Sequence, residues 1–153
     1  MTDDVFDLDV SVNERVTMPP GYQSAEINLV VESVLRAEDA SGPWEISIAF
    51  ADDHELRELH RKYLADDTPT DIMTFPFETD GDWAGVGEVV RGGDIAISVD
   101  RAAEQAIDGG WDAASELKFL VAHGVLHLLG WDDSSAELRS QMLERQREIL
   151  AGL

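Results

Sequence analysis

The sequence predicts a single α+β domain over residues 1–153, in which helices cover a small mixed sheet of about four strands. Segments with the patterns of strands and helices alternate over about the first hundred residues, whereas three helical segments fill the rest. A length of 153 residues is near the common size of one domain, and an apolar fraction of 44% is enough for one core. One of the late helices, near the C-terminus, also carries the candidate metal-binding residues.

The first third of the chain predicts a strand, a helix and a second strand. Apolar and polar residues alternate over most of residues 6–12, which is typical of a half-buried strand. Residues 27–35 place apolar side chains at the spacing of one helix face. Residues 44–50 alternate again and predict the second strand.

The middle of the chain predicts another helix and two more strands. Carboxylates at residues 52–55 are typical of a helix N-terminus, and the apolar face that follows consists of Leu56, Leu59 and Tyr63. Residues 71–77 resemble a strand, but Pro76 donates no backbone hydrogen bond and places that strand at a sheet edge or ends it. The Gly- and Asp-rich residues 79–92 predict a hairpin or loop, and residues 94–98 predict a short buried strand.

Three helices are expected in the last third of the chain. The first spans residues 99–107, and the second spans residues 113–129 and stops at Gly130. The third is expected to begin at a capping box formed by Ser134 and Glu137. Its packing face consists of Leu138, Met142 and Ile149.

The second of these helices carries the residues most informative about chemistry. His123 and His127 are four residues apart and share one helix face, so both imidazoles can bind one metal ion. A histidine pair alone also occurs as core residues. Here Gly130 lets the chain turn back, and Asp133 supplies a third ligand. Two helical histidines and one later ligand are typical of a catalytic zinc site with an open position, so we expect a metal-dependent hydrolase.

Composition restricts the other possibilities. The chain has no cysteine, which excludes disulfides, cysteine zinc sites and thiol nucleophiles. The apolar stretch at residues 119–129 is too short to span a membrane and the N-terminus is acidic, so we expect a cytoplasmic protein without membrane contact. The net charge of −21 disfavours non-specific binding to nucleic acid. This charge has two interpretations. The surface is adapted to its solvent, for instance to a salty environment, or it docks to a basic protein partner.

Three blocks of residues carry a family resemblance. Residues 123–133 are His-Gly-Val-Leu-His-Leu-Leu-Gly-Trp-Asp-Asp, residues 69–77 are Pro-Thr-Asp-Ile-Met-Thr-Phe-Pro-Phe, and residues 93–97 are Gly-Asp-Ile-Ala-Ile. They resemble the His-Gly-x-Leu-His-Leu-x-Gly-Tyr-Asp-His, Pro-Thr-Asp-Val-Leu-Ser-Phe-Pro-Phe and Gly-Asp-Ile-x-Ile segments of the YbeY family of bacterial endoribonucleases. The blocks follow the family's order, and the resemblance covers roughly residues 20–150.

This resemblance implies a fold, a cofactor and an activity. It implies a four-stranded sheet with surrounding helices and one zinc ion per chain. It also implies single-strand-specific cleavage of RNA, maturation of the 3′ end of small-subunit ribosomal RNA, and a role in ribosome quality control. The implied partners are ribosomal RNA and either ribosomal proteins or assembly factors.

The sequence departs from the family pattern at two positions. Asp133 stands where the family has its third histidine; aspartate is also a good zinc ligand, although its charge should make a metal-bound water less acidic. Asp132 is a competing candidate, but it aligns with an aspartate that the family does not use as a ligand. Leu64 replaces an arginine thought to face the RNA phosphate in the family.

Two nearby cations are candidates to replace that arginine. Arg61 and Lys62 precede Leu64 by three and two residues and are our candidate substrate-binding residues. Neighbouring helix positions point in different directions, so the alternative interpretation is that these cations, with Arg57, form a solvated helix face.

The motif contains no evident side-chain base, so no catalytic side chain is assigned. In zinc peptidases of the His-Glu-x-x-His type the glutamate is the base, and Gly124 occupies its position here. A metal-bound water is therefore the expected nucleophile, and attack by the RNA 2′-hydroxyl stays open. Asp94 and Thr74 are candidates either to line the cleft or to be structural, and we favour the structural role.

Two other functions remain open from the sequence. The first is a non-catalytic ribosome-assembly factor that keeps the metal for folding, as Leu64 and the acidic composition suggest. The second is a zinc peptidase, which the spacing of His123, His127, Gly130 and Asp133 suggests and Gly124 opposes.

Overall fold

The four strands of the protein form one mixed sheet. The computed structural model describes residues 7–40, 42–64, 70–78 and 89–153, and the structural statements below refer to these residues. The strand order is β1-β2-β4-β3, with β1 and β4 parallel to β2 and with β3 antiparallel to β4. The predicted α+β class with a small mixed sheet is confirmed.

The elements follow the order expected from the sequence. The strands are β1 (Leu8–Glu14), β2 (Trp44–Ala51), β3 (Ile72–Glu78) and β4 (Arg91–Ser98). The helices are α1 (Ser24–Ala37), α2 (Asp53–Leu64), α3 (Val99–Gly109), α4 (Ala113–Leu128) and α5 (Ala136–Ala151). β3 pairs with β4 alone among the described strands, so the proline-containing strand does lie at a sheet edge. Of the predicted hairpin or loop at 79–92, residues 79–88 lie outside the described residues, as does Phe6 of the first strand.

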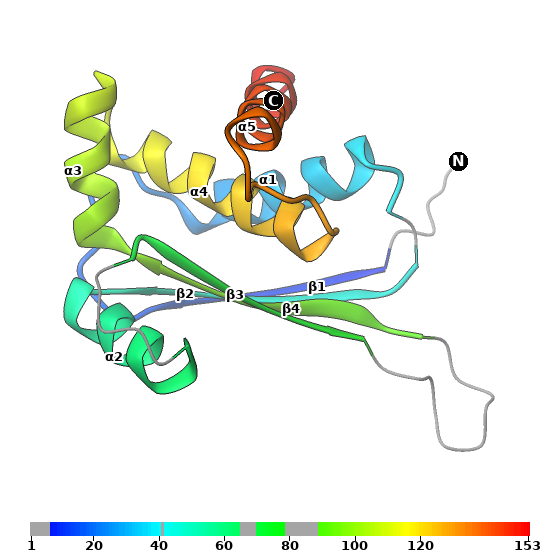
Figure 1. The fold of residues 1–153 in the computed structure, drawn as a ribbon, viewed down its shortest axis with the longest axis horizontal. Helices are drawn as coiled ribbons and strands as arrows, with labels where there is room; N and C mark the ends of the chain where they lie inside the picture. The colour runs from blue at the N-terminus through cyan, green and yellow to red at the C-terminus, as the bar shows by residue number, and fades with distance from the viewer. Residues whose placement is uncertain (1–6, 41, 65–69, 79–88) are drawn as a thin grey trace.

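The helices cover the two faces of the sheet unequally. Figure 1 shows α1, α4 and α5 on one face and α2 on the other, while α3 stands at the end of the sheet against α4. Because α5 packs on α1 and α4, helix α4 is enclosed between the sheet and α5. This position explains why α4 is apolar on nearly every side. Among the described residues, no helix is both long and apolar enough to cross a membrane.

The core follows from strand alternation. Inward-facing Ile46, Ile48 and Phe50 of β2 pack with Ile95 and Ile97 of β4 against α1 and α4, and all five are essentially fully buried. A smaller cluster on the α2 side consists of Ala51, Leu56, Met73 and Ala96. The main core therefore lies between the sheet and α1 and α4, and the α2 face of the sheet is only partly covered, with Glu45 and Ser47 of β2 exposed.

The start of α5 differs from the prediction by one residue. Ser135, not Ser134, is the N-cap, and its hydroxyl accepts a hydrogen bond of 3.1 Å from the Leu138 amide. Ser134 instead donates its amide and hydroxyl hydrogens to the Asp132 carboxylate, at 2.8 and 2.9 Å. With this register Met142 and Ile149 are buried as expected, but Leu138 is exposed.

The apolar face predicted for α2 is also narrower than expected. Leu56 is fully buried, but Tyr63 is 57% exposed and touches the protein through its ring edge, with a centroid 5.5 Å from that of Phe75. The helix covers only part of its sheet face, so its last turn extends beyond the core.

At Gly93, strand β4 lies close to both helix α4 and strand β3. A Cβ atom there would lie 2.6 Å from Leu128 Cδ2 of α4 and 2.6 Å from the backbone oxygen of Phe75 in β3. The backbone oxygen cannot move without breaking the strand pairing. The absence of a side chain at Gly93 therefore sets how closely α4 approaches the sheet.

We expect Gly93→Ala to lower the free energy of unfolding by about 3 kcal/mol, because the added methyl overpacks the α4–sheet contact. Urea unfolding measures this change. The matched control is Gly109→Ala at the end of α3, where the nearest atom to an added Cβ is 3.4 Å away. It should be neutral or slightly stabilising. Equal stability of the two variants would contradict the close packing at Gly93.

Candidate metal centre

The candidate metal centre is built at the C-terminal end of α4. Asp112 caps the start of this helix, accepting the Ser115 amide hydrogen at 2.7 Å. In the second half of α4, the regular backbone places His123 and His127 one turn apart. Their ring centroids are 4.6 Å apart and their Nε2 atoms are 3.0 Å apart. The spacing seen in the sequence thus becomes a pair of converging nitrogen atoms.

A tight turn after α4 returns the chain to this pair. Gly130 adopts a φ of +99°, and its amide donates to the His127 oxygen at 2.9 Å, while the Trp131 amide donates to the Leu126 oxygen at 3.0 Å. These two bonds form a Schellman motif, which requires the left-handed conformation that glycine adopts easily. The Trp131 indole N–H then donates to Glu38 of α1 at 2.7 Å. The segment that follows α4 is therefore fixed both by backbone hydrogen bonds and by the Trp131 side chain.

This turn delivers Asp133 to the histidine pair. Its Oδ2 atom lies 3.2 Å from His123 Nε2 and 3.3 Å from His127 Nε2. Ligand atoms placed 2.0–2.1 Å from a tetrahedral zinc ion lie about 3.3 Å from one another. The three atoms are thus spaced as three corners of such a site, and this group could hold a metal ion.

The hydrogen bonds on the far side of each imidazole fix its tautomer. His123 Nδ1–H donates to Gln146 Oε1 at 2.7 Å, and the Gln146 amide is itself oriented because its nitrogen donates to the Phe119 oxygen at 3.1 Å. His127 Nδ1–H donates to the Trp131 oxygen at 3.1 Å. With Nδ1 as the donor, each ring turns its Nε2 atom toward the Asp133 carboxylate, and this nitrogen is the metal-binding atom of a neutral imidazole. Three converging acceptors favour a cation between them, so the donor set fits a divalent metal.

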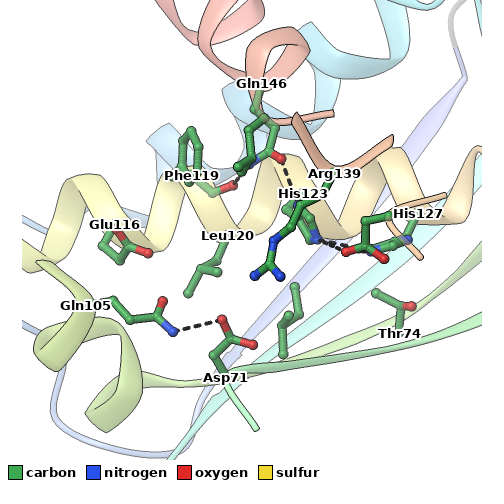
Figure 2. Close-up of a pocket in the computed structure, with 13 residues that line it drawn as sticks. Asp71, Thr74, Gln105, Glu116, Phe119, Leu120, His123, His127, Arg139 and Gln146 are labelled. Atoms are coloured by element: carbon green, nitrogen blue, oxygen red, sulfur yellow. Dashed lines mark hydrogen bonds and ion pairs between the residues drawn. The ribbon is translucent and has the colours of Figure 1, made fainter. Parts of the chain in front are cut away.

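A pocket of about 460 Å³ opens in front of these three side chains. As Figure 2 shows, its walls come from separate parts of the chain, with Asp71 and Thr74 at β3, Gln105 on α3, and further residues on α4 and α5. Asp71 accepts a hydrogen bond of 3.0 Å from Gln105. The side chains of His123, His127 and Asp133 are 14%, 25% and 34% exposed, so the pocket reaches them without leaving them on an open surface.

Asp94 and Thr74 lie on opposite faces of the sheet. Thr74 lines the pocket beside the histidines, although we expected it to be structural. Asp94 lines a different cavity with Tyr63 and Phe75, on the side of α2. The alternation of side chains along neighbouring strands accounts for this separation.

The structure does not bring Arg61 or Lys62 to this pocket. Both lie on α2, which covers the opposite face of the sheet. Arg61 forms an ion pair with Glu58, and the Lys62 ammonium lies 5.2 Å from the centroid of the Tyr63 ring. Their proposed role in binding substrate at the metal centre is therefore not supported by their position.

Several pocket residues are absent from the sequence-based assignment. Gln146, which orients His123, and Arg139 both belong to α5, seven residues apart and so on one helix face. Glu116 precedes His123 by seven residues on α4 and lies on the same face as the histidine. Helical spacing alone could have grouped them, but only the packing of α5 on α4 shows which face meets the pocket.

Glu116 is the buried carboxyl group of the pocket. It is 8% exposed and accepts a hydrogen bond of 2.8 Å from the Trp111 indole. Burial raises the pKa of Glu116, the Trp111 hydrogen bond opposes this rise, and the charge of Asp71 adds to it. The carboxyl group therefore prefers the protonated form more than an exposed glutamate does.

Together the fold and the site define a class of protein. A small mixed sheet carries a buried helix whose two histidines, with a returning carboxylate, face an accessible pocket. This is the arrangement of a metal-dependent hydrolase. Residues 11–153 match the family model described as endoribonuclease YbeY, and the chain belongs to the YbeY family.

Individual relatives agree with this assignment. A protein of Roseiflexus castenholzii named endoribonuclease YbeY is 40% identical over 151 residues, covering 95% of each chain. One of the same name from Moorella thermoacetica is 38% identical over 146 residues, covering 92% of this chain and 94% of the relative. A solution structure from Thermotoga maritima matches with a TM-score of 0.56 at 21% identity, over 92% of this chain and 85% of that one, and supports the fold.

Gln146→Leu should weaken metal binding. The substitution keeps the buried volume but removes the acceptor of His123 Nδ1–H and the donor to the Phe119 oxygen. We expect the affinity for zinc to fall about 10- to 100-fold, measured by competition with a chromophoric chelator. Gln141→Leu, on the exposed side of the same helix, is the matched control. Unchanged affinity in Gln146→Leu would show that Gln146 does not orient the histidine.

Glu116→Gln should change how stability depends on pH. Because the folded-state pKa of Glu116 is raised, its contribution to stability is present at low pH and is lost as pH rises through that pKa. Glutamine keeps an acceptor for Trp111 and does not titrate. Relative to wild type, the variant should therefore gain free energy of unfolding as the pH rises above 4.5, the ordinary pKa of a glutamate.

Urea unfolding at several pH values measures the effect of Glu116→Gln. Glu144→Gln, at an exposed position of α5, removes the same charge and serves as control. A parallel pH profile in all three proteins would contradict a raised pKa of Glu116.

Proposed function

We propose that residues 1–153 form one endoribonuclease domain that uses zinc to cleave single-stranded RNA. Family membership supports the activity, since the relatives described above are named endoribonucleases. The observation that carries the metal dependence is the convergence of two imidazole nitrogens and one carboxylate oxygen within 3.0 to 3.3 Å of one another. In this proposal the enzyme acts in the cytoplasm, where it matures the 3′ end of small-subunit ribosomal RNA and serves ribosome quality control.

The proposed ligands of one zinc ion are His123, His127 and Asp133. Zinc bound there would act as a Lewis acid toward a phosphate oxygen and lower the pKa of a bound water molecule. Compared with a third histidine, the Asp133 carboxylate reduces the net charge of the centre by one unit, which weakens the attraction for phosphate. Gln146 and the Trp131 oxygen hold the two imidazoles in the tautomer that binding requires.

The competing carboxylate, Asp132, has another task. Both its oxygens accept hydrogen bonds from Ser134, which shapes the segment between the Schellman turn and α5. This geometry favours Asp133 as the ligand and Asp132 as a structural residue.

The shape of the site supports single-stranded RNA as substrate. The metal-binding group lies inside a pocket of about 460 Å³, within the range of small-molecule sites. A flexible strand can bend to place one phosphate there, whereas a base-paired helix keeps its backbone on a stiff cylinder. Specificity for single-stranded RNA then follows, because only a flexible strand can bring a phosphate to the metal-binding group.

The packing of Gly124 opposes the zinc-peptidase alternative. A Cβ atom at Gly124 would lie 3.0 Å from Ile95 Cδ1 and 3.1 Å from Ile72 Cδ1. This position therefore faces the sheet core and not the pocket. A glutamate base at this point of the helix has no room, so the chemistry of the His-Glu-x-x-His peptidases is not available.

Partner proteins are part of the proposal because of the charge. A chain with net charge −21 repels the RNA backbone at long range. Basic ribosomal proteins or assembly factors, by contrast, would be attracted to it. We propose that such partners bring the enzyme to its ribosomal RNA.

Asp133→Ala tests the function. Removing the carboxylate should reduce bound zinc well below one ion per chain and lower single-stranded RNA cleavage by at least about 100-fold. Asp133→His should retain both. Asp132→Ala, which removes the neighbouring carboxylate, should leave zinc content and cleavage close to wild type. The measurements are metal analysis of the purified proteins and cleavage of a labelled single strand with a matched duplex as comparison.

Two outcomes would contradict the proposal. If zinc-loaded wild type and Asp133→Ala show the same RNA cleavage, the metal centre is not the active site. If a folded but inactive Asp133→Ala protein restores growth to a strain lacking its own YbeY protein, the non-catalytic assembly role is the function. Leu64 and the acidic composition are the features that favour this non-catalytic role as the alternative.

A further inference from the structure

Arg139 introduces a positive charge into a pocket that is otherwise acidic. The charged groups around the pocket, apart from the histidines, are the carboxylates of Asp71, Glu116 and Asp133 and the guanidinium of Arg139. Figure 2 shows the Arg139 side chain reaching from α5 over the pocket, between the Glu116 end and the histidines. An RNA strand that enters the pocket therefore meets the Arg139 guanidinium beside the metal centre.

The Arg139 guanidinium has no protein partner within the described part of the chain. Elsewhere, arginines pair closely with carboxylates, as in Arg145 with Glu38 at 2.7 Å and Arg101 with Asp53 at 3.0 Å. Arg139 lines the same pocket as three carboxylates but, within the described part of the chain, forms an ion pair with none of them. Its donors are available to a ligand.

The position of Arg139 on its helix does not explain the charge. It lies four residues after the N-cap Ser135, near the N-terminal end of α5. The helix dipole at this end favours anions over cations. A stabilising role within the helix is therefore not the reason for a cation at this point. The neighbouring pocket offers a better explanation.

The face of α5 that carries Arg139 is held in place. Residues 139, 143 and 146 share this face, and Gln146 is fully buried against His123. Met142 and Ile149 anchor the adjacent face in the core. The base of the Arg139 side chain thus has a fixed relation to the metal centre, while its tip can adjust to a ligand.

Apolar side chains next to Arg139 suggest a nucleotide and not a free anion. Phe119, Leu120 and Leu143 line the same pocket as the guanidinium. Inorganic phosphate would use only the charge, whereas a ribose or base can also pack on these apolar groups. Arginine suits the phosphate because its fork of donors matches two phosphate oxygens.

We propose that Arg139 binds a backbone phosphate of the RNA strand adjacent to the phosphate held at the metal centre, and that Phe119, Leu120 and Leu143 receive the attached nucleoside. This inference rests on the proposed function, since it assigns a substrate subsite to the same pocket. It makes Arg139 a substrate-binding residue that sets where the strand lies relative to His123 and Asp133.

The test compares zinc-loaded wild type with Arg139→Ala, Arg139→Lys and Arg147→Ala. Arg147 is a matched control, because it is exposed on the same helix, has the same charge and does not line the pocket. The probe is a short labelled 2′-O-methyl single strand, which resists cleavage. Fluorescence anisotropy gives its Kd between about 50 and 200 mM salt. Zinc content and thermal unfolding are measured for every variant.

We expect Arg139→Ala to raise Kd about tenfold at the lowest salt and to reduce the slope of log Kd against log salt by about 0.7, the value for one single-strand phosphate contact. Arg139→Lys should restore most of the slope, and Arg147→Ala should leave slope and Kd near wild type. Equal effects of Arg139→Ala and Arg147→Ala would overturn the proposal. A loss of zinc or thermal stability in Arg139→Ala would also overturn it, by assigning Arg139 a structural role.

The same experiment separates this inference from the proposed function. If wild type cleaves unmodified single-stranded RNA and Arg139→Ala matches it in binding, the subsite is wrong and the function stands. If the strand binds through Arg139 but unmodified RNA is never cleaved, the subsite stands and the nuclease function is wrong. Failure of wild type to bind the strand would overturn both.

Discussion

The convergence of His123, His127 and Asp133 is the constraint on which the surrounding structure depends. Two imidazole nitrogens and a carboxylate oxygen lie within 3.0 to 3.3 Å of one another, an arrangement that a bound cation would stabilise. The fold holds them together through independent contacts: the turn at Gly130, the Trp131–Glu38 hydrogen bond and the buried amide of Gln146. A metal ion would stabilise the arrangement that these contacts hold together, so metal binding and folding stability should be linked.

Charge places a second constraint on the molecule. A net charge of −21 opposes the approach of RNA from solution, and three of the carboxyl groups line the pocket itself. A bound divalent ion and Arg139 are then the local sources of attraction for phosphate. The net charge of the protein thus attracts basic proteins at long range. The metal ion and Arg139 act only locally, on a phosphate that is already in the pocket. This division is consistent with the proposed delivery of the RNA by basic partner proteins.

The sequence predicts what local spacing determines. The strand and helix order, the edge position of the Pro76 strand and the His123–His127–Asp133 group all follow from patterns within short segments. Gln146 and Arg139 escaped prediction because they reach the site only through the packing of α5 on α4. Arg61 and Lys62 were assigned from their nearness to Leu64 in sequence, which does not reveal that α2 covers the other face of the sheet.

The packing of α4 also limits which chemistry its residues can perform. Its inner face at Gly124 touches Ile72 and Ile95, so no side chain there reaches the pocket. Glu116 does face the pocket, but seven residues separate it from His123, which is about 10 Å along a helix axis. At that distance its carboxyl group suits hydrogen bonding to a more remote part of the strand and not proton transfer at the histidines. Since no carboxylate other than Asp133 is beside the imidazoles among the described residues, the proposed RNA cleavage would depend on a metal ion at this group and on how accurately Arg139 and the apolar wall position the strand.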